Sequence, residues 1–158
     1  MRRPWNIINT PVYSLATYDE TNVNMNICTY VMAVSRKPKL YAISIEHGSK
    51  TLENLENSSV GVLQLLTAMH SNLIRPLGLK SGKKVNKHQW LTKNAQLIEW
   101  QAQSVLKDAA AYLMLEKISQ ETVGDHELFI FKTIKSKTLS ETGILMFQDL
   151  IDQKIILS

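Results

Sequence analysis

Apolar and polar residues alternate with a period of two along the first third of the chain, and this pattern predicts β-strands with one buried face. The clearest run covers residues 23–33. Its apolar face holds Val23, Met25, Ile27, Val31 and Ala33, and its polar face holds Asn24, Asn26, Cys28 and Tyr30. Residues 40–46 alternate in the same way and residues 12–18 more weakly. We therefore expect three strands before residue 47.

Helical patterns are fewer and shorter than strand patterns. Residues 49–58 predict a helix in which Ser49 or Thr51 serves as N-cap. Residues 69–74 predict one or two helical turns. A terminal helix is expected at about 142–153, where apolar residues recur at helical spacing at Met146, Phe147, Leu150 and Ile151.

The rest of the chain reads mainly as strands. Apolar segments of strand length occur at 60–66, 97–100, 110–118 and 126–134, and the last two flank a turn-rich segment at 120–125. Many short strands with few helices favour a mostly β, antiparallel sandwich or barrel with peripheral helices. A doubly wound sheet is disfavoured because it needs regular alternation of strands and helices.

Composition narrows the class of protein. With 158 residues, 44% hydrophobic and 20% charged, the chain has the values of one globular domain, which we expect to span 1–158. Its net charge of +4 favours anionic ligands in general, without pointing to nucleic acid. The densest basic run, 79–87, also reads as a plain solvated loop.

The same composition bears on location and redox state. Cys28 is the only cysteine, so an internal disulfide is impossible and a cysteine-based metal site is disfavoured. No apolar run approaches bilayer length, and the N-terminal residues lack the apolar core of a signal peptide. We therefore expect a cytoplasmic protein that does not bind a membrane.

Ser49, Lys50 and Thr51 are the first candidates for ligand chemistry. A helix start offers free backbone N–H groups to an anion, two hydroxyls add donors and Lys50 adds charge. This combination suits a phosphate, although ordinary capping beside an exposed lysine gives the same pattern. The sequence contains neither GxGxxG nor GxxxxGK[ST], the usual phosphate-loop motifs.

Amide and imidazole side chains supply further candidates. Asn24 and Asn26 are poor strand formers that share a face, where their donors and acceptors would suit a flat heterocycle; a water-facing strand is the alternative. His126 begins a strand beside Asp125 and could donate a proton near a substrate, or lie on the surface. The histidines are too scattered for a metal cluster, and no catalytic triad can be assembled.

Several of these segments, taken in order from about residue 11 to about residue 135, resemble the flavin reductase-like, FMN-binding split-barrel family. The matching parts are the strands at 14–18 and 24–29, the Ser35 to Pro38 turn, Ser44-Ile45 leading to Ser49-Lys50-Thr51 and Asn54, the strand at 61–66, the "G-x-x-S-G-x-x-x-x-K" segment at 78–87, and Gly124-Asp125-His126. The resemblance implies a six-stranded antiparallel Greek-key split barrel, usually a homodimer with FMN near the interface. It also implies that flavin is reduced by NADH or NADPH, or that electrons pass through a bound flavin.

The resemblance assigns roles to residues of this chain. The FMN-binding set it implies is Asn24, Asn26, Cys28, Thr29, Ser44, Ser49, Lys50, Thr51, Ser81 and Lys87, with His126 on the nicotinamide side. The chain departs from the family pattern at three places. Lys39 replaces the second proline of the turn, residues 19–22 replace an Asp-Gly turn, and Met114 stands where many members carry cysteine.

Three functions remain open on the sequence alone. The first is an NAD(P)H-dependent flavin oxidoreductase, and the second is a non-catalytic or electron-carrying flavoprotein of the same fold. The third is a small basic barrel that binds nucleic acid. It ranks last because no aromatic residue interleaves with the basic run as a stacking platform requires, so no nucleic acid partner is expected.

Overall fold

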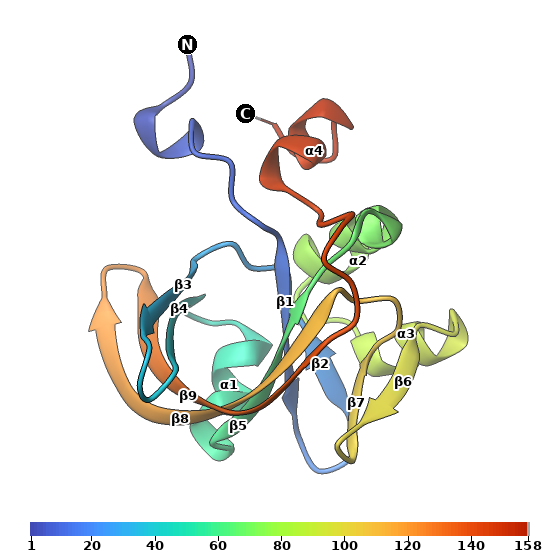
Figure 1. Cartoon of the computed structure of the whole chain (residues 1–158). Helices are drawn as coiled ribbons and strands as arrows, with labels where there is room; N and C mark the ends of the chain where they lie inside the picture. The colour runs from blue at the N-terminus through green and yellow to red at the C-terminus, as the bar shows by residue number, and fades with distance from the viewer. Residues whose placement is uncertain (158) are drawn as a thin grey trace.

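A seven-stranded antiparallel sheet forms the centre of the computed structural model, which describes residues 1–157 (Figure 1). Its strands are β1 (Tyr13–Tyr18), β2 (Val23–Met25), β3 (Val31–Ser35), β4 (Leu40–Glu46), β5 (Val60–Leu65), β8 (Ala111–Val123) and β9 (His126–Thr138). They are arranged in the order β2-β1-β5-β8-β9-β4-β3. A separate two-stranded ribbon pairs β6 (Leu97–Trp100) with β7 (Gln103–Leu106).

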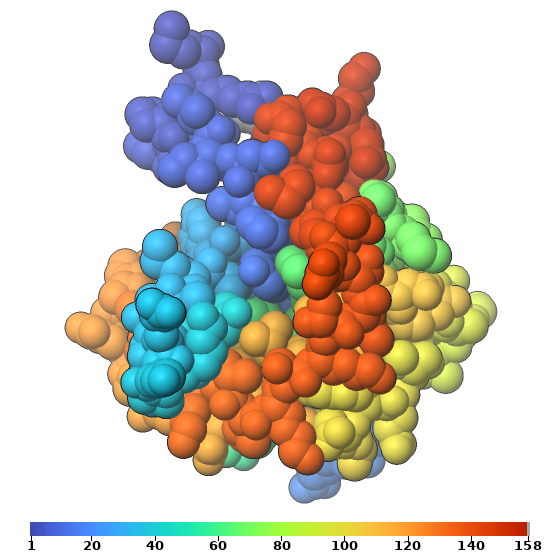
Figure 2. All heavy atoms as spheres, in the orientation of Figure 1, coloured from blue at the N-terminus to red at the C-terminus, as the bar shows by residue number. Residues whose placement is uncertain are grey.

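Short helices surround the sheet. They are α1 (Lys50–Asn57), α2 (Ile74–Gly78), α3 (Lys87–Lys93) and α4 (Phe147–Asp152), with 3-10 turns at Pro4–Asn6 and Ala68–Leu73. Within residues 1–157, no helix is long and apolar enough to cross a bilayer. Figure 2 shows the N-terminal and C-terminal segments side by side at one end of the molecule. A hydrogen bond of 2.8 Å from the Phe147 N–H to the Thr10 carbonyl joins them.

The prediction of a mostly β, antiparallel fold with few helices is confirmed, but the sheet has seven strands and is not the predicted six-stranded barrel, and the predicted continuous strand over 23–33 is interrupted. The segment divides into β2 and β3, which form opposite ends of a seven-stranded sheet. Between them, Cys28 exchanges backbone hydrogen bonds of 2.8 and 2.9 Å with Tyr13 of β1, and the Tyr30 carbonyl accepts one of 3.1 Å from the Ser44 N–H of β4. The link between β2 and β3 therefore contacts both halves of the sheet.

The side chain of Asn26 explains where the strand breaks. Its Oδ1 accepts a hydrogen bond of 2.8 Å from the Leu15 N–H of β1. A side-chain carbonyl thus takes the position that a backbone carbonyl would hold in a continuous ladder. Since the Leu15 N–H keeps an acceptor, the segment after β2 can separate from β1 without leaving a buried N–H group unpaired.

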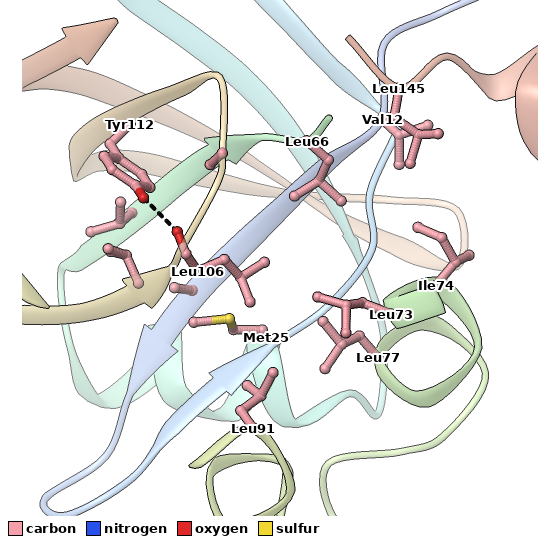
Figure 3. Close-up of a cluster of buried hydrophobic side chains, with 14 of the residues drawn as sticks. Val12, Met25, Leu66, Leu73, Ile74, Leu77, Leu91, Leu106, Tyr112 and Leu145 are labelled. Atoms are coloured by element: carbon pink, nitrogen blue, oxygen red, sulfur yellow. Dashed lines mark hydrogen bonds between the residues drawn. The ribbon is translucent and has the colours of Figure 1, made fainter. Parts of the chain in front are cut away.

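Two apolar clusters support this arrangement. One joins β1, β4, β5, β8, β9 and α1 and includes Leu15, Ile43, Leu55, Leu63, Phe129 and Phe131. The other lies against α2, α3 and β7, where the Tyr112 hydroxyl donates to the Leu106 carbonyl (Figure 3). Phe129 and Phe131 are fully buried with their ring centres 5.6 Å apart, so this face of β9 points into the core.

Other boundaries differ from those predicted. The terminal helix covers Phe147–Asp152 and not 142–153. Residues 120–123 belong to β8, because the hairpin turns tightly at Gly124 and Asp125, where Gly124 has a φ of +60°. The strand β7 was not predicted at all. The α1 helix does begin as expected, with Ser49 as its N-cap.

Candidate functional site

One cavity of about 490 Å³ lies where the start of α1, the link between β2 and β3, the end of β4 and the loop before α3 meet. It gathers every residue that the sequence nominated for the site. These are Asn24, Asn26, Cys28, Thr29, Ser44, Ser49, Lys50, Thr51, Ser81, Lys87 and His126. The cavity is also lined by Tyr30 and His47, which the sequence analysis did not nominate.

The start of α1 presents uncommitted backbone donors to this cavity. The Ser49 Oγ accepts a hydrogen bond of 3.1 Å from the Leu52 N–H, and the Ser49 carbonyl accepts one of 3.2 Å from the Glu53 N–H. Among residues 1–157, the backbone N–H groups of Lys50 and Thr51 have no hydrogen-bond acceptor. Free N–H groups at the positive end of a helix attract an anion.

The floor beside this helix start is a buried pair of polar side chains. Asn24 Nδ2 donates a hydrogen bond of 3.2 Å to Thr51 Oγ1, and both residues are buried. The loop before α3 lies directly on them at Gly82. A methyl group at this position would overlap the Asn24 amide oxygen and lie 2.9 Å from Lys50 Cβ. The glycine is therefore required for the loop to close against the helix.

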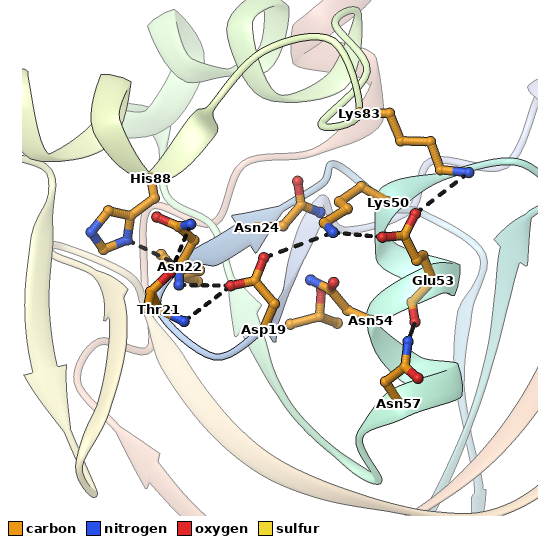
Figure 4. Close-up of polar contacts among 12 residues, drawn as sticks. Asp19, Thr21, Asn22, Asn24, Lys50, Glu53, Asn54, Asn57, Lys83 and His88 are labelled. Carbon is orange, nitrogen blue, oxygen red and sulfur yellow. Dashed lines mark hydrogen bonds and ion pairs between the residues drawn. The ribbon is translucent and has the colours of Figure 1, made fainter.

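Lys50 is more constrained than the sequence suggested (Figure 4). Its Nζ lies 2.7 Å from Glu53 Oε1 and 3.7 Å from Asp19 Oδ2, and Lys83 of the loop lies 3.7 Å from the other oxygen of Glu53. The hydrogen bond to Glu53 raises the pKa of Lys50. An anion at the start of α1 must therefore compete with two carboxylates for this ammonium group. The i, i+3 spacing of Lys50 and Glu53 was the available sequence signal.

Lys87 is a buried cation without a carboxylate partner. Its Nζ donates hydrogen bonds of 3.0 Å to the Met25 carbonyl and 2.7 Å to the Leu77 carbonyl, so it ties β2 to α2. It makes no ion pair within residues 1–157. Burial lowers its pKa from the usual 10.5 to about 8, because removal from water disfavours the charged form.

Two histidines stand at the rim of the cavity, each beside a carboxylate. His126 Nδ1 lies 2.6 Å from Asp125 Oδ1, so its Nε2 is left for another partner, and its ring centre lies 5.4 Å from that of Tyr30. His47 Nε2 lies 2.9 Å from Glu127 Oε2. The His126 contact lowers the pKa of Asp125. Asp125, which precedes His126 in the chain, thus orients the His126 ring.

Metal and thiol chemistry receive no support from the side chains. Residues 1–157 contain no cluster of histidine, cysteine or acidic residues able to hold a metal ion. Cys28 is buried, and burial raises its pKa to about 12. Cys28 is therefore a packed, protonated thiol.

The fold and the cavity together define a class of protein, and comparison with known proteins identifies it. The chain belongs to the family described as "Flavin reductase like domain", whose model matches residues 1–151. No curated protein sequence matches the chain.

Solved structures with the same fold agree with this assignment. A flavin reductase called PheA2 is 26% identical, with 90% of this chain and 88% of that chain covered and a TM-score of 0.76. An FMN-binding protein from Thermus thermophilus is 21% identical, with 93% and 86% covered and a TM-score of 0.79. The NADH:FAD oxidoreductase SgcE6 of Streptomyces globisporus is 16% identical, with 92% and 86% covered and a TM-score of 0.81.

Proposed function

We propose that the cavity binds FMN and that the protein is an NAD(P)H-dependent flavin oxidoreductase. The observation that carries this proposal is the start of α1. Two unpaired backbone N–H groups, at Lys50 and Thr51, face the same cavity as the buried Asn24 amide. Donors for a phosphate and polar residues that would line a heterocycle therefore lie in one space. The Thermus protein named as FMN-binding and the reductase PheA2 share this fold and support the choice of ligand.

The residues present fit the cofactor. The volume of about 490 Å³ is within the usual range for small-molecule sites, roughly 300–1,000 Å³. The N–H groups of α1 and Lys50 would hold the phosphate, whose charge they complement. Asn26 and the backbone of Cys28 and Thr29 would line the ring, and Lys87 would place a positive charge near it.

When bound, the flavin supplies the capacity to accept a hydride, and the protein supplies orientation and electrostatics. The rim formed by Tyr30 and His126 would position the nicotinamide of NADH or NADPH. Asp125 fixes the His126 ring by accepting a hydrogen bond from Nδ1–H, which leaves Nε2 free for a hydrogen bond to the substrate. No side chain is needed as a proton donor for hydride transfer itself.

Flavin binding and turnover can be separated experimentally. The purified protein, titrated with FMN at micromolar concentrations, is expected to bind it with a change in the visible flavin bands. Mixing the FMN-loaded protein with NADH or NADPH should then bleach those bands within a turnover. Binding without bleaching by either nucleotide would favour the electron-carrying alternative, and absence of binding would contradict both.

At the phosphate site, two substitutions are predicted to change the affinity for FMN in opposite directions. Lys50→Ala should weaken FMN binding severalfold. Glu53→Gln should strengthen FMN binding severalfold, because the substitution releases Lys50 from a 2.7 Å ion pair. The Lys50–Glu53 pair is partly exposed to solvent, which keeps the effect of its release small. Riboflavin lacks the phosphate and is the control, so its affinity should change in neither variant. Equal changes for FMN and riboflavin would place the phosphate elsewhere.

We also propose that the protein is a homodimer. The edge strand β3 and the residue before it expose apolar side chains, with Tyr30 at 64%, Met32 at 67% and Val34 at 48%. Tyr30 also lines the cavity, so a second copy seated here would cover its rim. Light scattering is expected to give twice the chain mass for the wild type and a lower mass for Met32→Lys. A monomeric wild type at micromolar concentration would exclude this dimer.

A further inference from the structure

The turn between β4 and α1 brings a second histidine, His47, to the main cavity. His47, Gly48 and Ser49 all line this cavity, and Gly48 has a φ of +77°. A methyl group at Gly48 would meet no atom within 4 Å, so the space over the turn is open. His47 lies two residues before Ser49, the N-cap of α1, and so adjoins the place proposed for the phosphate. An imidazole at this position can contribute to ligand binding.

Glu127 of β9 fixes the ring of His47 through one of its nitrogens. His47 Nε2 lies 2.9 Å from Glu127 Oε2, and the same carboxylate accepts hydrogen bonds of 3.1 Å from Gln120 Nε2 and Thr122 Oγ1 of β8. The Glu127 side chain is only 13% exposed, whereas that of His47 is 41% exposed and can be reached by a ligand. The hydrogen bond with His47 lowers the pKa of Glu127, which is therefore a charged acceptor at neutral pH. His47 Nε2–H is the donor of this bond, which leaves Nδ1 for a ligand.

Charged and titratable groups from several elements surround His47. Those that line the cavity or interact with His47 are Glu46, Lys50, Lys80, Lys87, Asp125, His126 and Glu127. Lys50 is already paired with Glu53, so its charge is shared between a ligand and this carboxylate. His126 resembles His47 in having a carboxylate on one nitrogen only, but it lies beside Tyr30 and not at the start of α1. His47 is therefore the histidine placed to meet a phosphate.

We propose that His47 is a further binding residue for the phosphate of FMN and that it takes up a proton when the phosphate binds. This inference rests on the proposed function, because it requires the phosphate at the start of α1. Histidine changes its charge near neutral pH, and an anion close by favours its charged form. Without ligand His47 has one such anion, Glu127. A bound phosphate would add a second at Nδ1, so that the imidazolium ion would bridge the two.

Titration calorimetry at pH 7, in buffers that differ in ionisation enthalpy, counts the protons taken up with each ligand. The wild type should take up a fraction of one proton with FMN and none with riboflavin, which lacks the phosphate. At this pH Lys87 contributes little, because its pKa of about 8 keeps it charged before FMN binds. His47→Gln retains an amide donor for Glu127 but cannot take up a proton. This variant should lose the uptake and bind FMN severalfold more weakly, with its affinity for riboflavin unchanged.

His126→Gln is the matched control, since it removes the other cavity histidine that has a carboxylate partner, and it should retain the proton uptake. Thermal unfolding of each variant verifies that it is folded. If FMN binds without proton uptake, or if His47→Gln keeps the uptake, this inference fails while the proposed function stands. Uptake that is lost in His126→Gln instead, or that riboflavin also causes, would overturn the inference in the same way. If neither FMN nor riboflavin binds the wild type, the proposed function fails and the inference fails with it.

Discussion

Replacing Lys87 by methionine is expected to abolish a rise in stability that the wild type shows between about pH 8 and pH 10.5. The pKa of the buried ammonium group is lowered from 10.5 to about 8 by its removal from water. Each pKa unit corresponds to about 1.36 kcal/mol, so the full effect on the free energy of unfolding is roughly 3 kcal/mol.

The direction of this effect follows from proton binding. Below pH 8 the amine is charged in both the folded and the unfolded chain, and its burial opposes folding. Between pH 8 and 10.5 the folded protein has released the proton while the unfolded chain still holds it. Because the unfolded state then binds more protons, stability increases with pH. Above 10.5 both states are neutral and the gain is complete.

Urea unfolding of the wild type and Lys87→Met at several pH values measures the effect. Lys137→Met removes an exposed lysine of β9 and should retain the rise of the wild type. An equal rise in Lys87→Met and in the wild type would mean that Lys87 is solvated in the folded protein. Since FMN is an anion, we also expect its affinity to fall as pH increases through 8 in the wild type and to do so less in Lys87→Met.

Asn26→Ala is expected to destabilise the protein by about 1–3 kcal/mol, the usual cost of a buried backbone donor left without an acceptor. The donor is the Leu15 N–H of β1, which gives its hydrogen bond of 2.8 Å to Asn26 Oδ1. Leu15 is fully buried, so water cannot replace the lost acceptor easily. The midpoint of urea unfolding provides the measurement.

Asn26→Asp is the matched variant, because a carboxylate oxygen can still accept from the Leu15 N–H. It should lose clearly less stability than Asn26→Ala at neutral pH. If the two variants were equally destabilised, the hydrogen bond to Leu15 would not be the reason for the asparagine. A role in ligand binding alone predicts no loss of stability in either.

Local pattern was enough to predict most of the sheet. The alternation of Tyr41, Ile43 and Ile45 predicted a strand over 40–46, which is β4 (Leu40–Glu46). Where a strand ends, however, depends on the strand that pairs with it, as β8 shows. Residues 120–123 are exposed and mostly polar and were interpreted as part of a turn, yet they extend β8 because β9 pairs with them as far as His126. A strand with two solvated faces lacks the alternation that marks a half-buried one.

The break at Asn26 could not be predicted, because apolar residues continue on both sides of it. Its cause is a contact with Leu15, which depends on how β1 and β2 pair. The hydrogen bonds that Lys87 donates to the Met25 and Leu77 carbonyls also join segments that are separate in sequence, 62 and 10 residues apart. In both cases the residue was assigned to a ligand, Asn26 because amides are unusual in strands and Lys87 by the family resemblance, whereas the structure also gives it a backbone partner.

The membership of the candidate site was predicted better than its electrostatics. Motifs spread from Asn24 to His126 come together in one cavity. The contact of Lys50 with Asp19, the neighbouring His47 and the position of Trp90 beside the basic run depend on loop conformations. Loops carry few periodic signals, so these contacts appear only in three dimensions.

The central claim is that the cavity at the start of α1 holds a flavin that accepts a hydride from a nicotinamide nucleotide. Anaerobic absorbance spectroscopy of the FMN-loaded protein, recorded before and after addition of NADH and then NADPH, tests it most directly. We predict that at least one nucleotide bleaches the visible flavin band within a turnover. A spectrum that neither nucleotide changes would contradict the account. A protein that loses FMN on a desalting column and does not bind FMN on titration would contradict it as well.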